Sequence, residues 1–172
     1  MTVLTSFEPI IAKNCKVLIV GSMPGVASLQ MHQYYAHPRN AFWPIMTEIY
    51  GIELGSTYEE RCSSLSAKGA GIWDVLKSCR RQGSLDSNIE SASEQANDFE
   101  SLFSIHRSIR TIIFNGGTAE RLYKKHILSS PMIKNQNLSY QRLPSTSPAY
   151  ASMKFVEKLE QWRSALVIAR RG

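Results

Sequence analysis

The sequence predicts an α/β protein, a three-layer α/β/α sandwich around a short, mostly parallel four-stranded sheet. Four short segments with strand character alternate with segments in which apolar residues recur at helical spacing. This alternation favours parallel strands that are covered by helices on both faces. The chain has 172 residues, of which 43% are hydrophobic. That size suits one domain over residues 1–172 with a core of its own.

The first half of the chain is expected to supply two strands and two helices. Val17–Val20 is an uninterrupted apolar, β-branched run that ends before a glycine, as in a buried strand. One helix is expected over residues 42–50 and another over residues 57–67, the second opened by a Thr-x-x-Glu capping box. A second short strand follows over Gly71–Val75.

The second half is expected to add two strands and three helices. A helix opens at the pattern Asn97-x-x-Glu100, the strand Thr111–Phe114 leads into a further helix, and Leu138–Leu143 forms the fourth strand. The last helix is expected over about residues 152–167. Its buried face is expected to consist of Phe155, Leu159, Trp162 and Leu166.

The functional site is expected at one edge of the predicted sheet, because ligands of such sheets bind beyond the carboxyl ends of the strands. The segments that leave those ends are Gly21–Asn40, Asp74–Asn88, Asn115–Thr118 and Pro144–Tyr150. We therefore look for chemistry in these four segments.

Charge is unevenly distributed along the chain, whose formal net charge is +6. Residues 82–106 contain acidic side chains and no lysine or arginine, whereas residues 121–142 and 154–171 carry an excess of basic ones. A basic side opposite an acidic side would steer a nucleic acid to one face. Ordinary solvated helices account for the pattern equally well.

Nothing in the sequence indicates a metal, a cofactor or a membrane. The three cysteines, Cys15, Cys62 and Cys79, form no Cys-x-x-Cys pair and cannot supply four ligands for zinc or an iron–sulfur cluster. We expect them to be reduced and mostly buried, as in a cytoplasmic protein. The N-terminal residues lack the pattern of a signal peptide, and no apolar run approaches the roughly 20 residues that span a bilayer.

Two segments have unusual chemistry. Gly21-Ser-Met-Pro-Gly25 lacks the third glycine of a dinucleotide-binding turn and the Gly-Lys pair of a P-loop. It is either a tight turn or a turn that presents backbone N–H groups to a ligand. Gln33–Trp43 crowds aromatic, basic and amide side chains around Pro38. Such side chains can stack on a base and orient water, and an aromatic packing loop is the alternative.

Together, these two segments resemble the first motif block of the uracil-DNA glycosylase superfamily. The run Leu-Pro-Ser-Thr-Ser-Pro-Ala-Tyr-Ala over Leu143–Ala151 is similar to the second motif, a Pro-Ser loop that intercalates into DNA. The chain most resembles the hypoxanthine-DNA glycosylase branch. Gly-Ser-Met-Pro-Gly, Tyr-Tyr-Ala-His-Pro-Arg-Asn, Gly-Ile-Trp-Asp-Val-Leu and Gly-Ser-Leu-Asp-Ser recur there in the order found here. The resemblance extends from about Phe7 to Trp162.

The resemblance implies a monofunctional DNA glycosylase of base excision repair. Such an enzyme would extrude a deaminated base, with hypoxanthine as the expected one, and hydrolyse its N-glycosidic bond. It would need neither a cofactor nor a nucleophilic lysine, and it would bind DNA as a monomer. A mismatch-specific uracil-DNA glycosylase is the alternative within the superfamily. A non-catalytic single-stranded DNA-binding module is the alternative from another class, but it needs a basic groove lined with aromatics, and here the aromatics concentrate in one loop.

The resemblance also assigns roles to individual residues. Asn40 would orient the attacking water, because Met23 stands where most of the superfamily has Asp or Asn, and a thioether cannot activate water. Leu143 replaces the histidine with which many relatives support the leaving base. The expected base pocket consists of Ser22, Met23, Gly25, Tyr35, Phe42 and Asp74, with Tyr35 stacked on the base. The expected DNA contacts are Arg142, Ser145, Ser147, Tyr150 and Lys154.

Asp74 is expected to read the base, at a position where relatives that read uracil carry Asn. Hypoxanthine has an N1–H donor beside its O6 acceptor, and a carboxylate can accept from that donor, whereas adenine presents a lone pair at N1. A hydrogen bond to a charged group contributes roughly 1.5–3 kcal/mol. Uracil also offers an N–H, so this argument leaves uracil open as the substrate.

The remaining polar residues of these segments have structural explanations. We expect His37 to be a packed or hydrogen-bonded residue and Asn115 to serve the Gly-Gly turn that it opens. Asp86 is as readily a loop residue as a functional one, and Asp74 by itself could simply end its strand. The other histidines, expected to be structural as well, are His32, His106 and His126.

Overall fold

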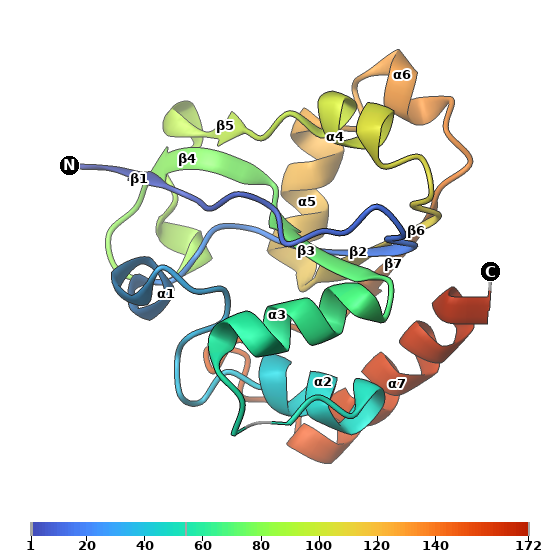
Figure 1. Cartoon of the computed structure of the whole chain (residues 1–172). Coiled ribbons are helices and arrows are strands. Elements are labelled where there is room, and N and C mark those ends of the chain that lie inside the picture. The colour runs from blue at the N-terminus through green and yellow to red at the C-terminus, as the bar shows by residue number, and fades with distance from the viewer. Residues whose placement is uncertain (1, 54, 172) are drawn as a thin grey trace.

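A four-stranded parallel sheet forms the centre of the computed structural model, which describes residues 2–53 and 55–171 (Figure 1). In spatial order its strands are β3 (Ala70–Asp74), β2 (Val17–Gly21), β6 (Thr111–Asn115) and β7 (Ser139–Leu143). All three neighbouring pairs are parallel. The four strands lie within one residue of their expected bounds and run parallel as expected, and the predicted fold class is confirmed.

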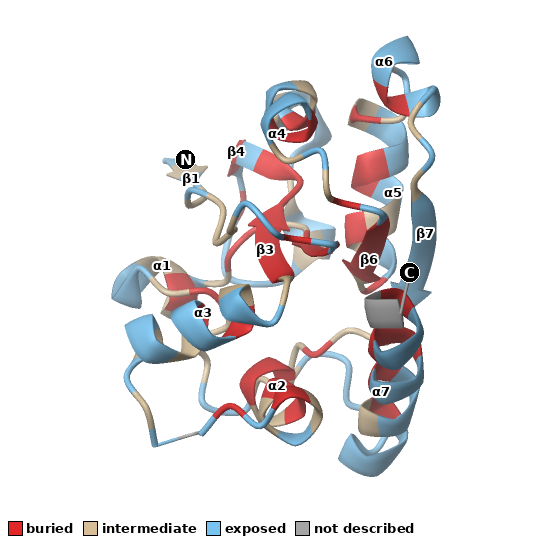
Figure 2. Cartoon of the chain, turned by 45° about the vertical axis from the view of Figure 1, so that its right-hand side comes forward, coloured by how far each residue is buried: buried red, intermediate tan, exposed pale blue. Residues whose placement is uncertain are grey.

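Helices cover both faces of this sheet (Figure 1 and Figure 2). One face carries α2 (Phe42–Tyr50), α3 (Tyr58–Ala67) and α7 (Phe155–Arg171). The other carries α4 (Phe99–Ile105) and α5 (Gly117–His126). Short helices in the connections are α1 (Val26–Met31), α6 (Pro131–Lys134), η1 (Asp86–Asn88) and η2 (Ser91–Ser93). The capping box expected at the start of α3 is present.

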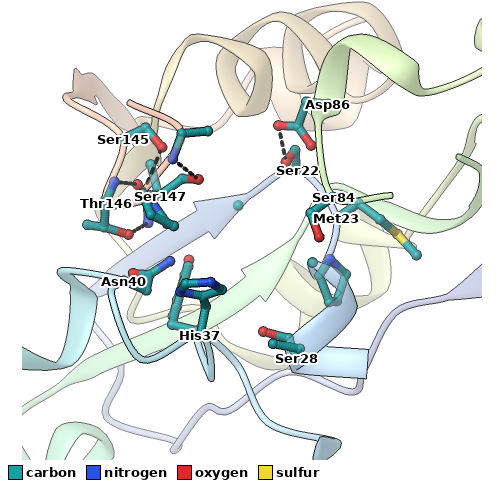
Figure 3. A pocket seen from close by; sticks show the side chains of 18 of the residues that line it. Ser22, Met23, Ser28, His37, Asn40, Ser84, Asp86, Ser145, Thr146 and Ser147 are labelled. Atoms are coloured by element: carbon teal, nitrogen blue, oxygen red, sulfur yellow. Dashed lines mark hydrogen bonds between the residues drawn. The ribbon is translucent and has the colours of Figure 1, made fainter. Parts of the chain in front are cut away.

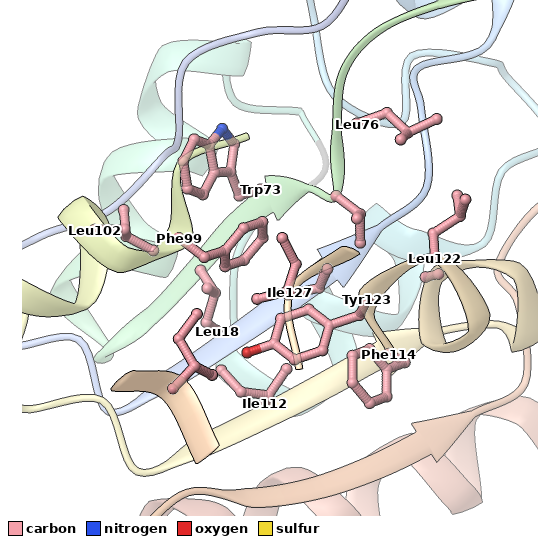
Figure 4. Close-up of a cluster of buried hydrophobic side chains, with 14 of the residues drawn as sticks. Leu18, Trp73, Leu76, Phe99, Leu102, Ile112, Phe114, Leu122, Tyr123 and Ile127 are labelled. Carbon is pink, nitrogen blue, oxygen red and sulfur yellow. The ribbon is translucent and has the colours of Figure 1, made fainter. Parts of the chain in front are cut away.

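Two buried clusters, one on each face of the sheet, explain why β2 is an unbroken apolar run. Leu18 and Val20 belong to the cluster beneath α4 and α5, to which Tyr123 also belongs (Figure 4). Val17 and Ile19 belong to the cluster beneath α2, α3 and α7. Because successive side chains of a strand point to opposite faces, a strand covered on both faces must be apolar at every position.

A second, antiparallel sheet adjoins the first and was not predicted. It consists of β1 (Val3–Thr5), β4 (Leu76–Arg80) and β5 (Gln95–Ala96), with β4 in the middle. One residue, Val75, separates β4 from β3, so the same chain segment passes from one sheet to the other. β4 has the mixed sequence Leu-Lys-Ser-Cys-Arg, and its partners have only three and two residues, so no apolar run marks these strands.

The start and the buried face of the last helix differ from the prediction. The helix begins at Phe155 rather than at residue 152. Trp162 and Leu166 are buried as expected and Leu159 is partly buried, but Phe155 is 41% exposed. Phe155 occupies the first position of the helix, where the chain has not yet reached the sheet that covers the rest of this face.

The cap of helix α4 also differs from the prediction. Asp98, and not Asn97, is the N-cap, since its carboxylate accepts a 3.0 Å hydrogen bond from the Ser101 N–H. The amide of Asn97 instead donates to the main-chain carbonyl of Asp74 at 2.9 Å. Asn97 therefore supports the end of β3 rather than the start of a helix.

The cysteines are free thiols buried in the core, as expected. Among the helices that the structure describes, none combines the length and the apolarity required to cross a lipid bilayer.

Candidate active site

A cavity of about 330 Å³ lies beyond the carboxyl ends of the parallel strands (Figure 3). Its lining comes from all four segments that leave those ends: the residues after β2, Asp74 and the loop after β4, Asn115 at the end of β6, and the loop after β7. From β2 the chain passes first to β3 on one side and later to β6 on the other. The cavity therefore lies at the point where the strand order reverses, the usual ligand position in open α/β sheets.

Asp74 and Gly21, at the ends of β3 and β2, form one side of the cavity together. They are register partners, and the Asp74 carboxylate lies in the space that a β-carbon on Gly21 would occupy. Only 3% of Asp74 is exposed. Its Oδ2 accepts a 3.1 Å hydrogen bond from the Ser6 hydroxyl, and the buried hydroxyl of Tyr35 lies nearby. The glycine thus makes room for a carboxylate at the strand ends.

Burial raises the pKa of Asp74 to about 7. Desolvation is the largest cause, because a buried carboxylate loses its hydration. The hydrogen bond from Ser6 and the charge of Arg81 lower the pKa, and the negative charge of Asp86 raises it further. Asp74 therefore exchanges its proton near neutral pH. As a carboxylate it only accepts hydrogen bonds, and as a neutral acid it can also donate one.

Asn40 borders the cavity just before helix α2. Its side-chain oxygen accepts a 2.9 Å hydrogen bond from the main-chain N–H of Phe42. The main-chain N–H of Asn40 donates to the His37 carbonyl at 2.8 Å. These bonds fix the amide at the cavity wall. An amide oxygen has two lone pairs and an amide nitrogen has two hydrogens, so Asn40 keeps groups with which it can hold a water.

On the other side of the cavity, the turn after β2 is tied to the loop after β4. The Ser22 hydroxyl donates to Asp86 Oδ2 at 2.6 Å (Figure 3). The fully buried guanidinium of Arg81 donates to the Pro24 carbonyl at 2.5 Å and to the Gly83 carbonyl at 2.9 Å, and it lies 3.7 Å from Asp86 Oδ1. Burial also raises the pKa of Asp86. One arginine therefore fixes both segments.

Thr146 anchors the loop after β7 to two other elements. It is 1% exposed, and its hydroxyl and N–H each make a 2.9 Å hydrogen bond with the amide of Asn115. Its carbonyl accepts from the Ala41 N–H at 2.9 Å. At Gly116, where φ is +94°, a β-carbon would come within 2.9 Å of the Ser145 β-carbon. The loop is thereby bound to the end of β6 and to the residue after Asn40.

The same loop is held at both of its ends by helix α7. The Trp162 indole donates to the Pro144 carbonyl at 2.9 Å. Lys158, which is buried, donates from Nζ to the Tyr150 carbonyl at 2.7 Å. Its ammonium also lies 5.1 Å from the centre of the Tyr150 ring. The loop that resembles the DNA-intercalation motif is thus fixed at its start, middle and end.

Most of the residues expected in the site border this one cavity. They are Ser22, Met23, Gly25, Tyr35, Asn40, Asp74, Ser145, Ser147 and Tyr150. Met23 is a special case, because its side chain points away from the cavity (Figure 3) and packs in the core beneath α4 and α5. Phe42 is fully buried and lies behind Tyr35, with the two rings stacked at 4.0 Å between centroids, and it is not among the cavity-lining residues.

Arg142 and Lys154, expected to contact DNA, lie outside the cavity lining. Arg142 has an exposed side chain whose Nη1 lies 3.3 Å from Glu120. Lys154 is exposed just before α7, where its N–H donates to Glu157. Both side chains stand on the surface around the site rather than in it.

Three residues for which the sequence offered a structural explanation also border the cavity: His37, Asn115 and Asp86. His37 accepts the Arg39 N–H at Nδ1, the kind of hydrogen bond expected, and lies beside Asn40 (Figure 3). Asn115 holds Thr146 in addition to opening its turn, and Asp86 is bound to Ser22.

At Glu94 the acidic segment contacts the basic helix α5 directly instead of lying on the opposite side from it. Glu94, from the acidic segment, has a side chain only 1% exposed and contacts both Lys125 and His126 of α5 at 2.6 Å. The ion pair with Lys125 and the hydrogen bond with His126 offset the burial of Glu94 at this contact.

Arg81, Thr146 and Lys158 contribute to the site without having been predicted. No local pattern distinguishes them, because each forms its hydrogen bond with a main-chain carbonyl or a side-chain amide in a different segment of the chain. Within the described residues there is no group of three or more His, Cys, Asp or Glu side chains that could hold a metal ion.

Comparison with known proteins places this cavity in a family. The family model of the uracil DNA glycosylase superfamily matches residues 8–167. A hypoxanthine DNA glycosylase of Methanosarcina barkeri is 39% identical over 111 residues, which are 64% of this chain and 69% of that protein. A hypoxanthine DNA glycosylase of Methanosarcina acetivorans is 33% identical over 144 residues, 83% of this chain and 85% of that protein.

A solved structure agrees with the sequence matches. The solution NMR structure of a candidate uracil DNA glycosylase from Methanosarcina acetivorans has a TM-score of 0.80 and 30% identity, and the match covers 99% of this chain and 98% of that one. Motifs, fold and cavity position point the same way: the chain belongs to the uracil DNA glycosylase superfamily.

Proposed function

We propose that the chain is a monofunctional DNA glycosylase of base excision repair, which removes a deaminated base, hypoxanthine above all, from DNA. One observation carries the proposal: Asn40 and the buried carboxyl of Asp74 border the same cavity at the strand ends. A water and a base can be held there together. Two relatives, 33% and 39% identical, bear the name hypoxanthine DNA glycosylase, which supports this choice of base.

The target nucleotide leaves the DNA stack and enters the cavity. A base within a duplex is out of reach of any side chain, so extrusion has to come first. The cavity of about 330 Å³ falls in the range of small-ligand pockets. Tyr35 borders the cavity with its ring held by Phe42, and the base stacks on it.

Asp74 reads the Watson–Crick edge of the base. Both protonation states of Asp74 accept from the N1–H of hypoxanthine, and the neutral acid also donates to O6. The charged form repels the N1 lone pair of adenine. The charged form therefore carries the discrimination against adenine, since a site rejects a base that leaves buried polar groups unpaired, whereas the neutral acid can donate to adenine N1.

Asn40 orients the water that attacks C1′ of the sugar. The C1′–N bond breaks as the sugar becomes oxocarbenium-like, and the base departs with the bonding electron pair. The water oxygen bonds to C1′, and one of its protons neutralises the departing base. The products are a free base and an intact abasic site.

The loop after β7 holds the strand during these steps. Ser145, Ser147 and neighbouring N–H groups contact phosphates, and Tyr150 fills the space that the extruded nucleotide leaves. The anchoring of this loop through Thr146 and Lys158 supports the role, because a fixed loop loses little conformational entropy on binding.

A panel of duplex oligonucleotides tests the proposal. Each duplex contains one hypoxanthine, uracil or xanthine, and alkali converts abasic sites into strand breaks that a gel resolves. We expect breaks at hypoxanthine with the wild-type protein and a large loss with Asn40→Ala, which controls for a contaminating glycosylase.

The other outcomes separate the alternatives. Breaks at uracil alone would identify a uracil-directed mismatch enzyme. Binding of single strands without any break would indicate a non-catalytic DNA-binding module, and the proposal would be abandoned.

A further inference from the structure

A second hollow, of about 530 Å³, lies beside the cavity between the start of α2 and the start of α7. We call it the α2–α7 groove; its lining comes from residues 38–44, 146–151 and 153–158. The residues common to cavity and groove are Asn40, Thr146, Ser147, Pro148 and Tyr150. The groove is therefore separated from the proposed base pocket only by side chains that belong to both.

Aromatic and apolar side chains give the groove its character. Tyr150 is 40% exposed and Phe155 is 41% exposed, and Pro38, Pro44 and Met153 also line it. Phe155 stands at the first position of α7 instead of in the core. Exposed aromatic rings that converge on one hollow have the character of a binding surface for a flat apolar group.

Positive charge accompanies these rings. Lys158 is 5% exposed, and its ammonium donates to the Tyr150 carbonyl at 2.7 Å and lies 5.1 Å from the centre of the Tyr150 ring. Arg39 lines the groove and is exposed. A hollow with aromatic walls and cations suits a nucleotide, whose base stacks on the rings while its phosphate pairs with the cation.

We propose that the α2–α7 groove binds the base of the nucleotide next to the extruded one in the same DNA strand. This inference rests on the proposed function. Neighbouring nucleotides are joined by a single phosphate, so a strand that places one sugar at Asn40 brings the next nucleotide over the shared wall. Tyr150 and Phe155 stack on that base whatever its identity, and Arg39 contacts its phosphate.

Strands that lack only the neighbouring base test the groove. Three single-stranded oligonucleotides contain one hypoxanthine; a tetrahydrofuran unit replaces the nucleoside on its 5′ side, on its 3′ side or on neither. Single-turnover excision at increasing protein concentration gives the half-saturating concentration, and fluorescence anisotropy gives the affinity independently of excision. We expect one of the two substitutions to weaken affinity by about 5- to 150-fold, the range for one base–aromatic stacking contact.

A pair of variants assigns this loss to the groove. Phe155→Ala should weaken the affinity for the unsubstituted strand by a similar factor. It should leave the fold unchanged, because the side chain is already 41% exposed. Val156→Ala is the matched control, since Val156 is the next residue, is 69% exposed and lies outside the groove lining. The affinity of Phe155→Ala for the tetrahydrofuran strand should be no lower than the affinity after either change alone, because both changes remove the same contact.

Three results would decide against the groove or against the activity. Equal affinity for all three strands, or additive losses of Phe155→Ala and tetrahydrofuran, would overturn the groove proposal even if hypoxanthine is released. Phe155→Ala without effect on any strand would do the same. A flank-dependent affinity without release of any base would keep the groove and reject the excision activity instead.

Discussion

The carboxylate of Asp74 fills the space above the α-carbon of Gly21, where any other residue would have its β-carbon. The two residues are register partners at the ends of neighbouring parallel strands, and the Tyr35 hydroxyl lies 3.3 Å from the same position. A glycine at 21 is therefore what allows a carboxyl to be buried beside the cavity. Gly21, the first glycine of the turn after β2, accommodates the Asp74 carboxyl and not a phosphate.

Gly21→Ala should displace the Asp74 carboxyl while the chain still folds. Overpacking of a buried site costs about 1–3 kcal/mol, so we expect a fall in Tm of roughly 2–12 °C for a chain of this size. Excision should fall by about tenfold or more, since each 1.4 kcal/mol of lost base recognition is a factor of about 10. Thermal denaturation and single-turnover kinetics measure the two effects.

Gly55→Ala is the control for this change, because a β-carbon at Gly55 meets no atom within 4 Å. Its Tm and excision rate should match those of the wild type. A Gly21→Ala protein with the wild-type rate would show that the position of the Asp74 carboxyl is unimportant for excision.

Asp74 should also make the fold less stable as the pH rises. Its pKa is about 7 in the folded chain against an ordinary value of 3.8, so between these values the folded state binds more protons than the unfolded state. The free energy of unfolding contributed by Asp74 is then fully present below about pH 4 and is lost as the pH rises through 7. The loss amounts to at most about 4 kcal/mol over this window.

Urea denaturation of the wild type and of Asp74→Asn at several pH values measures this effect as a difference, in which the other titrating groups cancel. The stability of the wild type relative to Asp74→Asn should decline from pH 4 to pH 7 and then level off. A flat difference would mean that Asp74 keeps an ordinary pKa in the folded chain.

Thr146→Val should loosen the loop after β7 without changing its shape. The hydroxyl that accepts the 2.9 Å hydrogen bond from the Asn115 amide is lost, while the Thr146 N–H bond to Asn115 remains. A buried donor left without its partner costs about 1–3 kcal/mol. We expect a lower Tm and weaker DNA binding by anisotropy. Thr146→Ser keeps the hydroxyl and should retain most of the wild-type Tm and DNA affinity. Equal Tm and affinity for the two variants would rule out the hydroxyl as an anchor.

The proposed hydrolysis needs no metal, so excision should proceed unchanged in EDTA. Water oriented by an amide and a base recognised by a carboxyl require no Lewis acid. Gel assays with and without the chelator measure this directly. Activity that disappears in EDTA and returns with one divalent ion would show that the mechanism lacks an essential component.

The parallel sheet was predictable because each of its inner strands is buried on both faces. Val17–Val20 is a continuous apolar run for that reason, and Thr111–Phe114 is apolar after its first residue. β4 escaped prediction because its sequence Leu-Lys-Ser-Cys-Arg neither alternates strictly nor runs apolar, since the exposed Lys77 and Arg80 interrupt its buried residues.

The cavity was predictable to the extent that strand ends determine it. Parallel strands bring their carboxyl ends to one edge, which is why Asn40, Asp74 and the loop after β7 border one cavity. Arg81 could not be foreseen, because its partner Pro24 is 57 residues away and a main-chain carbonyl has no signature in sequence. Helical periodicity likewise placed Phe155 in the core, since periodicity does not reveal where a helix extends beyond the sheet.

Asn40→Ala should abolish most of the chemistry and spare binding. The variant removes the amide that borders the cavity while leaving the pocket open to a base. Single-turnover excision should fall by roughly 10²–10⁴-fold, the range for loss of a group that positions a proton transfer or a water. Affinity for DNA should change little, because phosphate contacts dominate it. Anisotropy on the same strand provides that control.

Asp74→Asn should change which base is removed more than how fast the best one is removed. The substitution keeps the size of the side chain but replaces a titrating carboxyl with an amide that both donates and accepts at every pH. The amide oxygen still accepts from the N–H of hypoxanthine or uracil, so the faster rate should stay within about tenfold. The permanent N–H donor of the amide changes how well each base edge is paired, so the ratio of the two excision rates should shift. The oligonucleotide panel measures this ratio. If Asp74→Asn instead abolishes excision of every base while Asn40→Ala is nearly silent, then the buried carboxyl near neutral pKa activates the water. The catalytic role would then belong to Asp74, and Asn40 would only hold the turn before α2 through its bond to the Phe42 N–H.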